Sequence, residues 1–160
     1  VYNKGAGQSL QRIPYFETKP EDYFIIVYTS GTTGLPKGAI HSQYSTLAIV
    51  YASDSEIPRH SLSSLTLPHP MGHISGSIVL LTYLAQGTQI VMFRHNNLEN
   101  ILVAVEKYKI DMLFLTTEHV FQLAQTQFPY NLSCIKAIGT GGAMIPDLII
   151  NKLKKSLKVI

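Results

Sequence analysis

The sequence predicts an α/β fold with a largely parallel sheet and helices on both faces. Its composition, with 46% hydrophobic and 14% charged residues in a chain of 160, suffices for one packed core and argues against disorder. Short apolar runs alternate with stretches of helical periodicity and return about every 22 residues, as the parallel strands of βαβ units do. These runs lie at 62–67, 88–93, 111–115 and 134–138.

The chain begins with a segment that has no periodic pattern. Residues 1–22 contain Gly, Pro and charged residues, so we expect a connecting segment there and part of a larger domain over 23–160. The first strand is predicted at Tyr23–Tyr28, where every residue is aromatic or β-branched. Because no polar residue interrupts this run, we expect a central parallel strand covered on both faces.

Five stretches with helical spacing follow. In the clearest one, Asn96 and Glu99 are placed as a capping box before a single apolar stripe formed by Leu98, Ile101, Leu102, Val105 and Tyr108. Another starts near Pro146, a residue that the first turn of a helix tolerates. The five predicted helices span about 43–53, 74–85, 98–109, 118–127 and 146–157.

Charge and cysteine content exclude several classes of function. The net charge of +3 comes partly from a cluster of lysines at 152–158, so no broad basic face and no nucleic-acid partner are expected. The single cysteine, Cys134, excludes an internal disulfide and a zinc site built from several thiolates. Its isolation indicates a reducing, intracellular compartment. We expect a cytoplasmic or peroxisomal location.

The longest nearly apolar run, 74–84, is about half of the roughly 20 residues that a membrane-spanning helix needs, so no transmembrane segment is expected. The chain starts without Met, and its last residues before Ile160 resemble the start of a strand. We therefore expect a piece of a longer protein, truncated at both ends. Its oligomeric state is not encoded in these features.

A loop rich in Gly, Ser and Thr directly follows the first predicted strand and reads YTSGTTGLPKG over 28–38. Its glycines permit positive φ and close approach of backbone N–H groups to oxygens, its hydroxyls add donors and Lys37 adds positive charge. The loop departs from the Walker pattern because Pro36 stands before the lysine. A polar linker uses similar residue types, but this order after an apolar strand favours a polyphosphate site.

At these residues the sequence resembles the adenylate-forming superfamily, which includes acyl-CoA synthetases, 4-coumarate:CoA ligases, beetle luciferases and peptide-synthetase adenylation domains. The string YTSGTTGLPKG matches that family's signature loop at every position. The resemblance implies that the loop holds the β- and γ-phosphates of ATP with Mg²⁺ while a substrate carboxylate attacks the α-phosphate. The residues that inherit this role are Thr29, Ser30, Gly31, Thr32, Thr33, Gly34 and Lys37.

The resemblance also implies the reaction of the parent protein. A small-molecule carboxylic acid would become an acyl-adenylate and then a thioester, with coenzyme A as the expected thiol. A luciferase-like oxygenase and a peptide-synthetase adenylation domain share the loop and differ in the second step. A non-catalytic nucleotide-binding relative is the alternative of another class. The family's catalytic Lys lies in a C-terminal domain that this chain lacks, so no catalytic residue is expected within it.

A second segment, LPHPMGHISG over 67–76, resembles the family's segment in which a His lines the acyl pocket. Aligned from Pro70, that residue is His73, whereas alignment from Pro68 gives Met71. We favour His73 because Gly76 then falls in register, and a surface or helix-capping histidine is the alternative. The spacing of His69 and His73 fits metal ligands on a helix, but the Pro and Gly between them discourage a helix, so no metal site is expected.

A third match is the turn Gly141-Gly142-Ala143 after the last predicted strand. In the family this turn lies against the adenine and the acyl group, and residues without bulk allow such close approach. A plain strand-to-helix turn is the alternative, and Met144 stands where the family usually has Pro. At Glu118 and His119, where many members have a Pro-rich turn, we expect the opening of a helix rather than a catalytic pair.

Overall fold

The computed structural model describes residues 16–29, 34–56 and 62–157. Its main body is a four-stranded sheet of order β4-β3-β5-β6 in which every neighbouring pair is parallel. The strands are β3 (Ser64–Leu67), β4 (Gln89–Met92), β5 (Met112–Leu115) and β6 (Ala137–Thr140). The predicted α/β fold with a largely parallel sheet is therefore confirmed.

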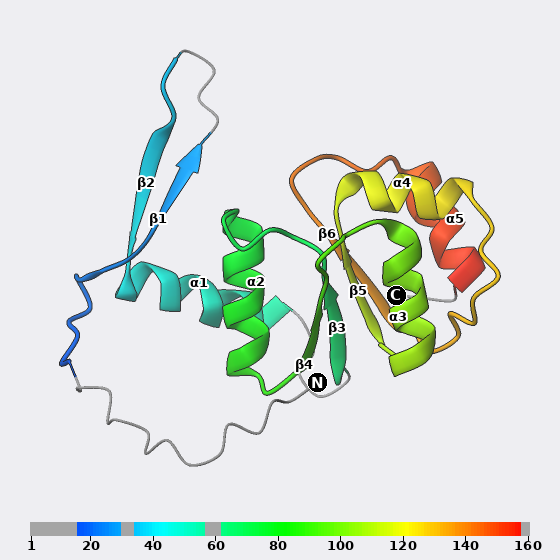
Figure 1. Cartoon of the computed structure of the whole chain (residues 1–160), viewed down its shortest axis with the longest axis horizontal. Coiled ribbons are helices and arrows are strands. Elements are labelled where there is room, and N and C mark those ends of the chain that lie inside the picture. Colours follow the sequence, from blue (N-terminus) through cyan, green and yellow to red (C-terminus); the bar gives the residue numbers. More distant parts are fainter. Residues whose placement is uncertain (1–15, 30–33, 57–61, 158–160) are drawn as a thin grey trace.

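Helices connect these strands and cover both faces of the sheet. Figure 1 shows α1 and α2 on one side of the sheet and α3, α4 and α5 on the other. The helices are α1 (Gln43–Glu56), α2 (Ile74–Ala85), α3 (Leu98–Tyr108), α4 (Thr117–Gln125) and α5 (Asp147–Leu157). All five predicted helices are present, with ends that differ by a few residues.

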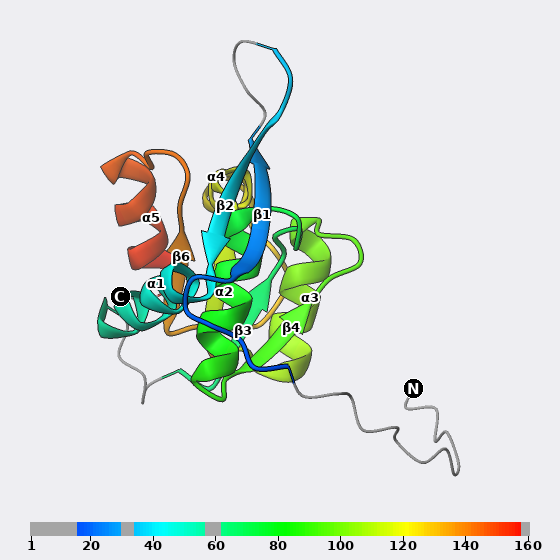
Figure 2. The same cartoon turned by 90° about the vertical axis from the view of Figure 1, so that its left-hand side faces the viewer.

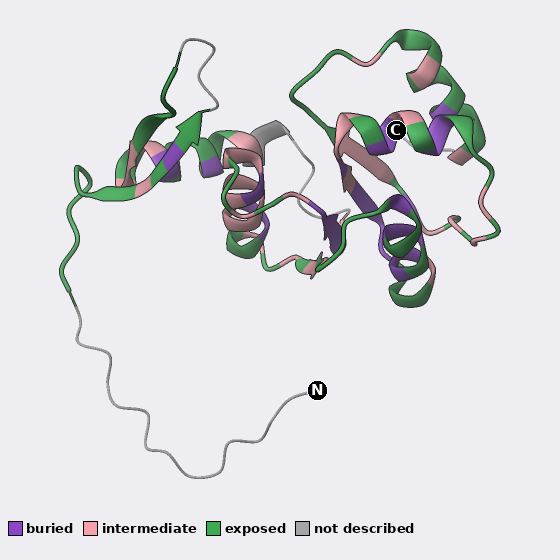
Figure 3. Cartoon of the chain, turned by 45° about the horizontal axis from the view of Figure 1, so that its top comes forward, coloured by how far each residue is buried: buried purple, intermediate pink, exposed green. Residues whose placement is uncertain are grey.

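The alternation of side chains along β5 explains why both faces are covered. Leu113 and Leu115 are fully buried and belong to a core cluster with α3, α4 and α5, whereas Met112 packs with Leu65 and Tyr83 in a second cluster under α2. Successive residues of a strand point to opposite faces, so an uninterrupted apolar strand needs cover on both. The deepest burial lies along β3, α3 and β5 (Figure 3).

The amino ends of three strands are tied together by one carboxylate. Asp111 accepts hydrogen bonds from the backbone N–H groups of Ser63 and Ser64 at 2.9 Å each, and from both serine hydroxyls. Lys136 donates to it at 3.3 Å. Burial alone would raise the pKa of Asp111, but these donors outweigh it and hold the pKa below its usual value.

The prediction that Tyr23–Tyr28 is a central parallel strand is wrong. Strand β1 (Tyr23–Thr29) pairs antiparallel with β2 (Lys37–Ser42) in a separate two-stranded sheet, and Val27 is its one buried residue. A short connection can join antiparallel strands, whereas a parallel pair needs a long crossover. An apolar run does not specify which elements will pack over it. The strand at Lys37–Ser42 was not predicted from the sequence.

The predicted capping box of α3 is also wrong. Asn97, not Asn96, is the N-cap, and its side-chain oxygen accepts from the backbone N–H of Asn100 at 2.8 Å. Asn96 instead donates from its side chain to the carbonyl oxygen of Pro68 at 3.1 Å, and Glu99 accepts from the Tyr130 hydroxyl. Two adjacent asparagines offer two helix starts, and the second one is used.

Within the described parts of the chain, no helix combines the length and the apolar character needed to cross a membrane.

Candidate active site

A cavity of about 760 Å³ opens at the carboxyl edge of the parallel sheet. A lining residue lies within four residues of the end of each strand: His69 after β3, Asn96 after β4, Thr116 after β5 and Gly141 after β6. Strands β3 and β5 are neighbours, and the helices that follow them, α2 and α4, lie on opposite faces of the sheet. Open α/β sheets bind ligands at such a point, where the connections diverge.

His73 lies on the wall of this cavity and also caps a helix. Its Nδ1 accepts from the backbone N–H of Ser75 at 3.2 Å and lies 2.6 Å from the Ser75 hydroxyl oxygen, which fixes the start of α2. His73 therefore makes the contacts of a helix-capping histidine, which was the alternative to a role in the acyl pocket. The competing residue, Met71, packs against the core cluster beneath α2 and does not line the cavity.

Gly76 brings α2 close to the segment before it. A Cβ at this position would meet the carbonyl oxygen of Pro70, so only glycine allows the first turn of α2 to pack against the loop that holds His69 and His73. The choice of His73 over Met71 as the residue of the acyl pocket stays a prediction. Among the described residues, no three of His, Cys, Asp and Glu group together as metal ligands would.

The Gly141-Gly142-Ala143 turn forms another wall of the cavity. Gly142 has φ of +92°, which favours glycine, and a Cβ at Gly141 or Gly142 would meet no described atom within 4 Å. The backbone of the turn is therefore open to a ligand. At its base, a Cβ at Gly139 would lie 2.8 Å from the Phe114 ring, so this glycine lets β6 pack against β5.

The loop predicted to bind phosphate lies between the two strands of the hairpin. Ser30, Gly31, Thr32 and Thr33 fall outside the described residues. Of its flanks, Thr29 donates from its hydroxyl to the carbonyl oxygen of Lys37 at 3.3 Å, and Gly34 has φ of +142°. Figures 1 and 2 show the hairpin projecting away from the sheet. Of the described loop residues, Thr29, Gly34 and Lys37 do not line the cavity.

Sequence reasoning missed the role of His119 in the cavity. It lies in the first turn of α4, as expected, and its backbone N–H bonds to the hydroxyl of the N-cap Thr116 at 3.3 Å. Its side chain, however, is buried in the cavity wall, with 7% exposure. Burial lowers the pKa of His119, and a hydrogen bond with the Asn96 backbone and the charge of Glu118 offset this only in part.

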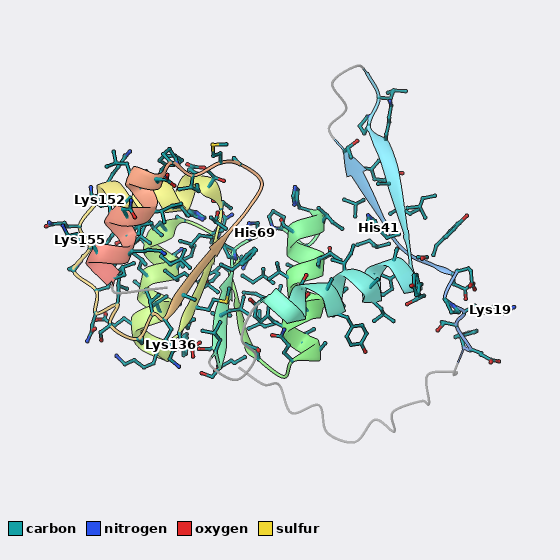
Figure 4. All side chains as sticks on the ribbon, turned by 180° about the vertical axis from the view of Figure 1, so that it is seen from behind. Lys19, His41, His69, Lys136, Lys152 and Lys155 are labelled. Atoms are coloured by element: carbon teal, nitrogen blue, oxygen red, sulfur yellow. The ribbon has the colours of Figure 1, made fainter. Side chains whose placement is uncertain are left out.

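His69 was considered only as a metal ligand, yet it lines the cavity. Figure 4 shows its side chain beside the end of the sheet, toward α2. Its ring packs on Phe114 with 5.0 Å between centroids and a tilt of 55°. Burial lowers the pKa of His69, and the nearby His73 and His119 lower it further. The position of His69, two residues after the buried strand β3, was a signal that could have identified it, whereas His119 lies inside α4.

Comparison with known proteins assigns this chain to a family. The model of the AMP-binding enzyme family matches residues 3–159. A 4-coumarate-CoA ligase of Narcissus pseudonarcissus is 31% identical over 91% of this chain, and the chain spans 28% of that protein's length. Relatives of this kind are therefore several times longer than the present chain.

Solved structures of longer proteins are also similar to this chain. The luciferase-like enzyme from the nonluminescent Zophobas morio mealworm is 31% identical, with a TM-score of 0.76, over 88% of this chain and 33% of its own. A red-emitting luciferase from Phrixothrix hirtus is 29% identical, with a TM-score of 0.81, over 99% of this chain and 31% of its own.

Proposed function

Because the chain belongs to the AMP-binding enzyme family, we propose that the protein carrying it activates a carboxylic acid with ATP as an acyl-adenylate. The observation that carries this proposal is the loop sequence YTSGTTGLPKG between β1 and β2. Its sequence supplies glycine N–H donors, several hydroxyls and Lys37 within one short stretch of chain. That combination suits a polyphosphate with developing negative charge.

In the proposed reaction, a carboxylate oxygen attacks the α-phosphorus of ATP and forms an acyl-phosphate bond. The bond between the α-phosphorus and the bridging oxygen breaks, and pyrophosphate leaves with its electron pair. The loop, with Thr29, Gly34 and Lys37 at its described flanks, stabilises the charge that builds on the leaving oxygens. Mg²⁺ would arrive with the nucleotide, because it prefers substrate phosphates and water to a protein cage.

The cavity at the carboxyl edge of the sheet is proposed to hold the acyl part of the adenylate. Its volume of about 760 Å³ is large enough for a drug-sized ligand. The open backbone of Gly141, Gly142 and Ala143 can approach a flat group closely. His73, the N-cap of α2, also lines the cavity. The loop would then contact the polyphosphate of ATP, and the cavity would contact the acid that attacks it.

A thioester-forming second step, with coenzyme A as the thiol, is the proposed fate of the adenylate. It is supported by the similarity to a protein named 4-coumarate-CoA ligase. Oxidation of the adenylate is the second candidate, favoured by the equally similar luciferase-like structure. The domain boundary at residue 22 and a location in the cytoplasm or peroxisome stay predictions.

Product analysis separates these steps. The protein is incubated with Mg-ATP and a panel of aromatic and fatty acids, with and without coenzyme A, and products are identified by mass spectrometry. We expect an acyl-adenylate from at least one acid, and its conversion to a thioester when coenzyme A is present. An adenylate that coenzyme A does not consume would overturn the second step alone, and the absence of any adenylate would overturn the proposal.

A further inference from the structure

An acidic side chain lines the cavity at the carboxyl edge of the sheet. Of the described residues around this cavity, Glu118 alone has a carboxylate, and no lysine or arginine is among them. The other titratable residues in its wall are His69, His73 and His119. Burial lowers the pKa of His69 and of His119, which favours their neutral forms. Glu118 therefore gives this part of the cavity a negative charge.

The contacts of Glu118 leave its carboxylate accessible to a ligand. The residue is exposed and lies in the first turn of α4, and its Oε1 accepts from the side-chain amide of Gln122 at 3.2 Å. Gln122 lines the cavity as well. Within the described parts of the chain, the Glu118 carboxylate has no other hydrogen bond and no ion pair. Its second oxygen can therefore accept from a bound molecule.

A carboxylate in the first turn of a helix also has a structural use. It interacts favourably with the positive end of the helix dipole. Glu99 has the same place in α3 as Glu118 has in α4, two residues after the N-cap, and it does not line the cavity. A comparison of these two residues therefore separates an effect on the helix from an effect on a ligand.

We propose that Glu118 selects acids whose acyl part carries a primary amine, and that the ammonium form of this amine pairs with its carboxylate. The inference rests on the proposed function and names the substrate class of the same cavity. An ammonium group has three N–H donors, and hydrogen bonds between charged groups are stronger than those between neutral ones. Gln122, bonded to Oε1, holds the carboxylate in place and adds its own carbonyl oxygen as a second acceptor.

The same charge would orient the acid in the cavity. The reacting carboxylate is negative, so its approach to Glu118 is unfavourable, whereas the approach of an ammonium group at the other end is favourable. Walls such as Phe114 and the Gly141 backbone exclude part of the water, so the pair is screened less than on an open surface. An acid with a second carboxylate in place of the amine would meet repulsion.

The test measures acid-dependent ATP–pyrophosphate exchange by the protein carrying this chain. The acids are aromatic and alkyl carboxylates in matched sets that end, far from the reacting group, in an aminomethyl group, an ethyl group or a second carboxylate. We expect the best amino acid of a set to exceed its ethyl counterpart about tenfold in kcat/KM, and the diacid to be the poorest. The difference should shrink as the salt concentration rises.

Three variants assign this preference to a residue. Glu118→Gln removes the charge and keeps the size, and it should reduce the ratio of amino to ethyl acid to about two. Glu118→Lys should reverse the order and favour the diacid, a gain that misfolding cannot produce. Glu99→Gln, the matched control in α3, should keep the wild-type order.

The outcomes separate the inference from the proposed function. Equal rates for amino and ethyl acids in the wild type, or an unchanged ratio in Glu118→Gln, would overturn the inference while exchange itself upholds the proposed function. A uniform loss for all acids in both Glu118 variants would assign the residue a structural role and overturn it too. A change confined to the KM for ATP would place the carboxylate at the nucleotide, with the same consequence. No exchange with any acid would overturn both proposals.

Discussion

The parallel sheet and the β1–β2 hairpin are both rich in apolar residues, yet the sheet residues are buried and most of the hairpin residues are exposed. Leu65, Leu113 and Leu115 in the sheet have 0% exposure, whereas Tyr23 and Tyr28 in the hairpin are 74% and 69% exposed. Strand order and crossover helices supply cover on both faces of the sheet. The hairpin has backbone pairing but few neighbours over its faces.

This difference teaches that composition alone does not reveal burial. The two regions also carry the two halves of the candidate site: the sheet presents a formed cavity, and the hairpin presents the loop sequence. A cavity walled by strand ends depends on the stability of the sheet. The loop on the hairpin is proposed to contribute to the chemistry. Changes in the two regions should therefore separate into effects on folding and effects on activity.

The largest expected effect on folding is that of Asp111→Ala. The change leaves the backbone N–H groups and hydroxyls of Ser63 and Ser64 without their acceptor at the base of the sheet. We expect a loss of about 3 kcal/mol in the free energy of unfolding. Urea unfolding measures it, with Asp147→Ala, an exposed carboxylate at the start of α5, as the matched control. Equal stability of the two variants would contradict this role.

Acidification should reproduce part of that loss. The pKa of Asp111 is lower in the folded than in the unfolded chain, so its stabilisation is complete above the unfolded value of about 3.9 and is lost as pH falls through the folded value. The free energy of unfolding should therefore fall with acidification below about pH 4. Asp111→Asn should show a shallower fall, and parallel pH curves for both proteins would argue against it.

The hairpin should respond in the opposite way, with activity lost and stability kept. Lys37→Ala removes one charge from the proposed phosphate site and should lower acid-dependent pyrophosphate exchange at least about tenfold, equivalent to ~1.4 kcal/mol. Lys152→Ala on the outer helix α5 is the matched control. Thermal unfolding should be unchanged in both. Exchange at the wild-type rate in Lys37→Ala would remove the loop from the site.

The smallest effect compares two neighbouring glycines in the cavity wall. Gly142 has φ of +92°, whereas no positive φ is found at Gly141, and a Cβ at either place has free space. Gly142→Ala should therefore cost about 1 kcal/mol in the free energy of unfolding, and Gly141→Ala should cost less. Paired denaturation curves measure the difference. An equal cost would show that the backbone angle at Gly142 is not what requires glycine.

Much of the sheet could be predicted because its strands and helices have distinct periods. The apolar stripe from Leu98 to Tyr108 is enough to predict the helix α3. The apolar run at Met112–Leu115 is enough to predict the strand β5. The pairing partner of Tyr23–Tyr28 could not be predicted, because an apolar strand fits a parallel sheet and a hairpin equally well. The choice between Asn96 and Asn97 as cap depended on the contact of Asn96 with Pro68, which lies far away in sequence.

The candidate site was predictable where residue type and order determine chemistry, and less so where the fold brings residues together. The Gly141-Gly142-Ala143 turn, chosen from its resemblance and its position after the loop, lines the cavity, whereas the role of the loop stays a prediction. His119 was assigned correctly to a helix start, but its burial beside His69 arises from the parallel arrangement of β3 and β5. Fifty residues separate the two histidines, and no local signal joins them.

The most direct test of the central claim, that this family member activates a carboxylic acid, is pyrophosphate exchange into ATP with and without added acid. The protein is supplied with Mg-ATP and labelled pyrophosphate, and the label in ATP is followed over time. The account predicts incorporation that depends on the acid and that stops when the acid is omitted. Incorporation without any acid, or none with any acid in a broad panel, would contradict it.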